Sequence, residues 1–126
     1  MGFIYYNPNP LKKSIGDCTV RAISLLTDQK WKEVYVGLVT TGFEHCDMPS
    51  SNIVWSKYLL DLGYQKEYLP NTCPYCYTVS DFCKDNSIGK YLLATGSHVV
   101  TVIDGNYYDT WDSGQQVPIY YWFKGE

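Results

Sequence analysis

The sequence has no long apolar run and no excess of basic residues. No stretch approaches the roughly 18 consecutive apolar residues of a membrane-spanning helix. Lysine and arginine number 10 against 13 aspartates and glutamates, a net charge of −3. A protein that binds nucleic acid electrostatically needs a basic face. We therefore expect neither a membrane nor a nucleic acid as a partner.

The start of the sequence is not expected to be an export signal. The opening residues, MGFIYYNPNP, carry neither a charged leader nor a long apolar segment, unlike a secretory signal peptide. The five cysteines, an odd number, then favour reduced thiols in a cytoplasm. We expect a cytoplasmic protein without a cofactor, and the sequence leaves its oligomeric state open.

The composition is that of one globular domain spanning residues 1–126. Apolar residues make up 45% of the chain and charged residues 18%, enough of each for a single core with a polar surface. Aromatic residues reach 17%, and 13 of them are tyrosines. Tyrosine suits half-buried strands, so a tyrosine-rich sheet is expected.

Helical patterns occupy the first half of the chain. Asp17 is a suitable N-cap for a first helix, and a second is expected to begin near Thr27 or Asp28. The second carries Trp31, Val34, Tyr35 and Leu38 at helical spacing. A third is expected to follow Ser50-Ser51 and to stop at Gly63. Trp31, Trp55 and Trp122 lie in apolar patterns and are expected in the core.

Strand patterns dominate the second half. YQKEYL alternates like a strand, and a short helix is expected after Thr78, which has capping-box spacing to Asp81. The runs GKYLLAT, HVVTVI, NYYDTWD and PIYYWFK follow, and Asp104-Gly105 indicates a hairpin between the second and third of them. Helices first and strands second predict an α+β fold, with N-terminal helices packed on a C-terminal antiparallel sheet.

Cys18 has the position of a candidate nucleophile. At the first turn of a helix, unpaired amides and the positive end of the helix dipole favour a thiolate. A thiolate nucleophile also needs a general base and a group that orients the base. Of the two histidines, His45 lies in a loop-like segment and His98 opens a strand. We therefore predict that His98 is the base.

The hairpin supplies a carboxylate, and its register decides which one. A three-residue connection from Asp104 to Asn106 would place Asp112 opposite His98, with Cβ atoms about 4.5–5.5 Å apart. A two-residue turn would place Asp109 diagonally on the same face as His98. Sequence does not fix the register. We favour Asp112, because Asp109 lies closer to the turn.

The segments GDCTVRAIS, GSHVVTVIDG and YYDTWDS together resemble the papain-like cysteine peptidase superfamily, most closely its small phage and bacterial members. The resemblance implies a peptidase-like or amidase-like hydrolase acting on a peptide or protein, in the host cytoplasm if phage-encoded. It implies Cys18 as nucleophile, His98 as base and Asp112 as orienting residue. Asp-Thr-Trp at 109–111 is similar to the Asn-Ser-Trp of papain-type enzymes, which makes Asp109 the alternative.

The family's oxyanion-hole glutamine has no counterpart before Cys18. Asn7 and Asn9 are the candidate amide donors, with the backbone N–H of Cys18 as the second donor. Losing one such donor costs roughly 10²–10³ in rate. The alternative hypothesis is therefore a catalytically inactive papain-like fold that serves as a phage or bacterial protein-binding factor.

Cys73 and Cys76 form a CxxC pair with zinc-knuckle spacing. A structural zinc site needs four ligands, and the other candidates are Cys46, Cys83 and His45. A redox role for the pair would require a strand before it and a helix start at it, whereas here it lies in a proline-flanked loop. We predict incidental thiols and no metal site. For Arg21 we expect a structural salt bridge.

Overall fold

The computed structural model describes residues 2–125, in which four helices and six strands form an α+β fold. The helices are α1 (Cys18–Thr27), α2 (Trp31–Glu44), α3 (Asn52–Asp61) and α4 (Val79–Asp85). The strands are β1 (Gly2–Tyr5), β2 (Gln65–Tyr68), β3 (Lys90–Ala94), β4 (Val99–Ile103), β5 (Asn106–Asp109) and β6 (Tyr120–Phe123). The predicted order, helices before most of the strands, is confirmed.

The six strands form one mixed sheet in the order β1-β5-β4-β3-β6-β2. Strands β2 to β6 pair antiparallel, as expected, but β1 pairs with β5 in parallel. The prediction of a purely antiparallel C-terminal sheet is therefore wrong at this edge. The segment GFIY has no period-2 alternation of apolar and polar residues to reveal a strand.

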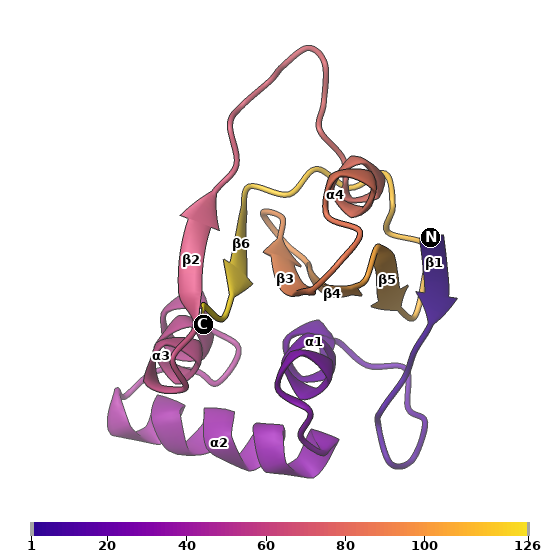
Figure 1. Ribbon diagram of the computed structural model, residues 1–126. Coiled ribbons are helices and arrows are strands. Elements are labelled where there is room, and N and C mark those ends of the chain that lie inside the picture. Colours follow the sequence, from indigo (N-terminus) through magenta and orange to yellow (C-terminus); the bar gives the residue numbers. More distant parts are fainter. Residues whose placement is uncertain (1, 126) are drawn as a thin grey trace.

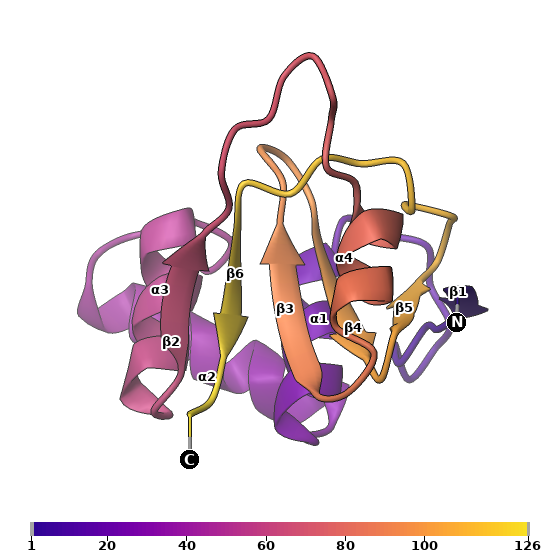
Figure 2. The ribbon, with the colours of Figure 1, turned by 45° about the horizontal axis from the view of Figure 1, so that its top comes forward.

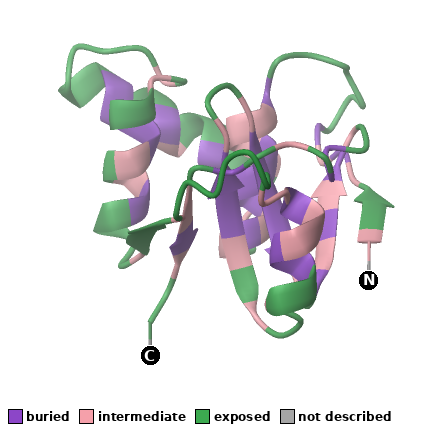
Figure 3. Ribbon diagram, turned by 90° about the horizontal axis from the view of Figure 1, so that it is seen from above, coloured by how far each residue is buried: buried purple, intermediate pink, exposed green. Residues whose placement is uncertain are grey.

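Helices cover both faces of the sheet. Figures 1 and 2 show α1, α2 and α3 on one face and the short α4 on the other. Leu92 and Ala94 of β3 pack toward α1–α3, whereas Leu93 between them packs toward α4. This alternation buries the central strands on both sides, as the burial colours of Figure 3 show.

Local capping explains several helix boundaries. The Ser51 side chain accepts a hydrogen bond from the Ile53 N–H at the start of α3, and Gly63, with φ of +92°, follows the end of that helix. Thr78 and Asp81 form the predicted capping box of α4. Asp28, in the left-handed conformation, ends α1. For this reason α2 begins at Trp31, later than expected.

Three tryptophans were predicted to lie in the core, and the prediction is confirmed for two of them. Trp55 and Trp122 are buried and their rings pack edge to face. Trp31 is only partly buried and stacks on Tyr35, which is half-exposed. The expectation that Trp31 belongs to the core is wrong, because α2 lies with this side at the surface. None of the helices within residues 2–125 is long and apolar enough to cross a membrane.

Candidate functional site

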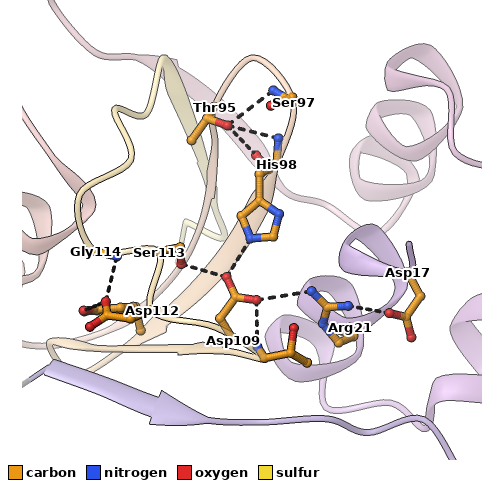
Figure 4. A network of polar contacts seen from close by, with 11 residues as sticks. Asp17, Arg21, Thr95, Ser97, His98, Asp109, Asp112, Ser113 and Gly114 are labelled. Carbon is orange, nitrogen blue, oxygen red and sulfur yellow. Dashed lines mark hydrogen bonds and ion pairs between the residues drawn. The ribbon is translucent and has the colours of Figure 1, made fainter. Parts of the chain in front are cut away.

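The hairpin between β4 and β5 has the two-residue register. Val102 pairs with Tyr107, and Ile103 pairs with Asn106. Asp104 and Gly105 both have positive φ, 49° and 80°, as a type I′ turn requires. This register brings Asp109 to His98, whose Nε2 lies 2.6 Å from Asp109 Oδ2 (Figure 4).

The prediction that Asp112 lies beside His98 is wrong. Strand β5 ends at Asp109, and the chain then turns, so the residues beyond it no longer pair with β4. The Asp112 carboxylate instead accepts hydrogen bonds from the Tyr107 hydroxyl and the Gly114 N–H. Its side chain is exposed to solvent. Asp109 is the carboxylate of this site, and it is 1% exposed.

Cys18 is the first residue of α1 and lies next to His98. The His98 imidazole and the Val99 backbone lie close enough to its thiol to lower the pKa of that thiol. Because Nε2 of His98 is engaged by Asp109, Nδ1 is the nitrogen left for the sulfur. Cys18 and His98 line one cavity of about 210 Å³ between the start of α1, the start of α3 and the turn before β4.

The surroundings favour the charged forms of all three side chains. Burial alone would raise the pKa of Cys18, but the nearby His98 imidazole and Val99 backbone bring it below its ordinary value. Burial would lower the pKa of His98, yet Asp109 and Cys18 raise it to about 9. The pKa of Asp109 is lowered by His98 and Ser113 against the effect of burial. A lowered thiol pKa beside a raised imidazole pKa is the combination that favours a thiolate–imidazolium pair.

Asp109 is held by a buried network. Its Oδ2 accepts from Ser113 Oγ at 2.7 Å, and its Oδ1 accepts from the Thr110 N–H at 2.8 Å. Arg21 Nη2 lies 3.2 Å from Oδ1, and Arg21 Nη1 pairs with Asp17 (Figure 4). The salt bridge expected for Arg21 is confirmed. It joins α1 to the carboxylate that faces His98.

Asp17 precedes α1 but does not cap it with its side chain. Its carboxylate accepts instead from Arg21 and from Trp31 Nε1, the latter at 2.9 Å. The first hydrogen bond from an α1 amide runs from Arg21 to the Asp17 carbonyl. The amides of Cys18 and Thr19 therefore have no capping carboxylate, and they lie at the positive end of the helix dipole.

Asn7 and Asn9, the predicted oxyanion donors, do not line the cavity of Cys18. Both are buried, and their side chains order residues 7–13: Asn7 Nδ2 donates to the Lys13 carbonyl, and Asn9 Oδ1 accepts from the Leu11 N–H. The prediction that they donate to an oxyanion beside Cys18 is therefore wrong, because they lie elsewhere. Asn52, the first residue of α3, lines that cavity instead.

The orientation of the Asn52 amide follows from its neighbour. Asn52 Oδ1 accepts from the Trp55 indole N–H at 3.0 Å. An indole nitrogen only donates, so the carbonyl oxygen must face Trp55 and the NH₂ group is free to donate elsewhere. Nothing in the sequence near Cys18 pointed to Asn52, because the two residues meet only when α3 packs beside α1.

Two further residues of the site escaped the sequence reasoning. The Trp111 ring lies 4.9 Å from the His98 ring, between centroids, and covers one side of the imidazole. The motif Asp-Thr-Trp was the available signal for it. Ser113, fully buried against Asp109, carried no sequence signal.

The CxxC pair lies apart from this site. Cys73 and Cys76 are exposed in the loop between β2 and α4. The described part of the chain, residues 2–125, contains no group of three or more His, Cys, Asp or Glu side chains arranged to hold a metal ion.

No family model, curated protein or solved structure matches the chain. The likeness to papain-like peptidases therefore remains a prediction. Function has to be argued from the geometry of Cys18, His98 and Asp109.

Proposed function

We propose that the chain is a cysteine hydrolase that cleaves peptide or amide bonds by acyl transfer. The observation that supports it most directly is the series Cys18–His98–Asp109, in which the partly buried thiol and imidazole line one cavity and Asp109 is buried behind them. Asp109 lies within hydrogen-bond distance of the base and the thiol shares a cavity with it, which supports the roles of nucleophile, base and orienting group. Asp109 takes the orienting role assigned to Asp112 from sequence.

The reaction begins with attack of the Cys18 thiolate on the substrate carbonyl carbon. The C–N bond of the tetrahedral intermediate then breaks, and the imidazolium of His98 gives its proton to the leaving amine. Water next attacks the thioester while His98 takes one of its protons, and the acid product leaves as the thiolate reforms. Asp109 holds the imidazole with Nε2 toward itself throughout.

The oxyanion of the intermediate would be bound at the start of α1. The N–H of Cys18 is the first donor, since the Asp17 side chain leaves this turn uncapped. Asn52, across the cavity, has the free NH₂ group that can act as the second donor. This pair takes the place of the glutamine that is missing before Cys18.

Alkylation kinetics test the activated thiol without knowledge of the substrate. Iodoacetamide at pH 6.5 should label Cys18 at least tenfold faster than the exposed Cys46, because a larger fraction of Cys18 is thiolate. Replacing His98 with alanine should remove most of this difference. Equal labelling of Cys18 in the wild-type chain and His98→Ala would contradict an ion pair. Peptide libraries with Cys18→Ser as the blank then test for turnover.

A second candidate function is protein binding without catalysis. The outer side of α2 exposes Val36, Val39 and Phe43, of which Phe43 is 84% exposed. An apolar helix side of this kind is typical of an interaction surface. Under this hypothesis Cys18→Ser retains a co-purifying partner and Phe43→Glu loses it, with no turnover by the wild-type chain.

A further inference from the structure

The loop between β2 and α4 carries Cys73-Pro74-Tyr75-Cys76 and extends well beyond the sheet (Figures 1 and 2). Both thiols are exposed, so neither contributes to the core as the buried Cys83 does. The proposed hydrolase uses neither of them. The pair therefore needs an explanation of its own.

Hydrogen bonds give the loop a defined turn around the two cysteines. The Cys73 N–H donates to Asn71 Oδ1 at 3.1 Å, and the Tyr75 N–H donates to the Thr72 carbonyl at 2.9 Å. Cys73 and Cys76 both line one cavity of about 260 Å³ at the base of the loop. Both cysteines thus belong to one short hydrogen-bonded turn, with the CxxC spacing of a zinc knuckle.

Within residues 2–125, no further ligand lies beside this pair. Cys83 is 2% exposed and packs in the core beneath α4. Cys46 and His45 follow the end of α2, on the opposite face of the sheet (Figure 1). His45 Nδ1 also lies 2.9 Å from the Thr41 carbonyl. Of the four ligands that a structural zinc ion takes, one chain supplies two.

We propose that two copies of the chain bind one Zn²⁺ between them, through Cys73 and Cys76 of each copy. A two-fold axis through the metal would complete a tetrahedral Cys₄ site, with Zn–S distances of about 2.3 Å. Residues 69–78 contain no charged side chain, so two such loops meet without charge repulsion. Because the loop extends away from the helices, the two bodies can stay apart while the loops touch.

Binding converts four thiols to thiolates and releases their protons as four Zn–S bonds form. Zinc affinity should therefore rise with pH until the thiols are ionised. The site is independent of Cys18, and its test does not depend on hydrolase activity.

The experiment is a titration of the reduced, chelator-treated chain with ZnCl₂ or CoCl₂, followed by light scattering and metal analysis. We expect the molar mass to double and one metal ion to be retained for every two chains. Cobalt should give the intense visible bands and the sulfur-to-metal charge-transfer band of a tetrahedral tetrathiolate site. Cys73→Ser and Cys76→Ser should abolish both effects, and Cys46→Ser, which removes an exposed thiol outside the loop, should change neither.

Three outcomes would overturn the proposal. The first is a chain that retains no zinc after gel filtration. The second is one zinc held by each monomer, which would exclude the shared site. The third is zinc-dependent dimers that persist in the Cys73→Ser variant. Circular dichroism of the variants establishes that they are folded, as expected for substitutions at exposed loop positions.

Discussion

Replacing Asp109 with asparagine should lower the pKa of His98. The structure raises that pKa from 6.5 to about 9, a rise of about 2.5, which corresponds to about 3 kcal/mol in favour of the imidazolium. Asp109 and Cys18 both contribute, and the Asp109 carboxylate is only 2.6 Å from Nε2. Asparagine removes this charge and leaves the positive Arg21 nearby. We therefore expect the pKa of His98 to fall by about 1–2 pH units.

The assay is an NMR titration of the imidazole C–H signals. The chain contains two histidines, so His45→Gln assigns both signals with one variant. Asp112→Asn is the matched control: it removes a nearby carboxylate that bonds Tyr107 and not His98. A His98 pKa that falls in Asp112→Asn and stays near 9 in Asp109→Asn would refute the two-residue register and the site built on it.

Further predictions concern stability. Arg21→Met should lower the free energy of unfolding by about 3–5 kcal/mol, because it leaves the buried Asp17 carboxylate without a charged partner and Asp109 with only that of His98. Lys57→Met breaks an exposed pair and should cost about 1 kcal/mol or less; urea unfolding that finds equal costs would contradict the difference in burial. Gly42→Ala in α2 should destabilise despite the better helix propensity of alanine, because the new Cβ would lie 2.7 Å from the Asp47 carbonyl oxygen; a raised melting temperature would contradict this. The raised pKa of His98 contributes stability to the folded state. This contribution is fully present below pH 6.5 and is lost as pH rises through about 9. The stability advantage of the wild-type chain over His98→Ala should shrink across that range, and a constant difference would argue against the raised pKa.

Much of the fold could be predicted because its signals are local. Ser51, Gly63 and the Thr78–Asp81 box mark helix boundaries through hydrogen bonds or backbone angles within a few residues. Strand β1 could not be predicted in this way. Its pairing with β5 joins residues about a hundred positions apart, and its side chains are largely exposed, so no apolar alternation marks it.

The types of residue in the site could be predicted from the sequence, but the register of the β4–β5 hairpin could not. The sequence predicts that Cys18 and His98 meet, and the structure places both on the lining of one cavity. The prediction of Asp112 as the third residue is wrong, because it assumes a three-residue connection where the hairpin has a two-residue turn. Asp-Gly is the preferred pair for a type I′ turn of two residues, and applying that preference strictly would have selected Asp109.

Asp17 shows why a local rule fails where a site is built. As the residue before α1 it has the N-cap preference, yet its carboxylate turns to Arg21 and Trp31. This orientation of the Asp17 carboxylate has two effects. It neutralises Arg21, which in turn holds Asp109 against His98, and it leaves the first turn of α1, beside the Cys18 amide, without a capping side chain. The missing cap costs α1 about 1 kcal/mol. Arg21 joins Asp17 to Asp109, and Asp109 pairs with the His98 imidazole. Replacing Asp17 should therefore change the stability of the start of α1 and the reactivity of the site together.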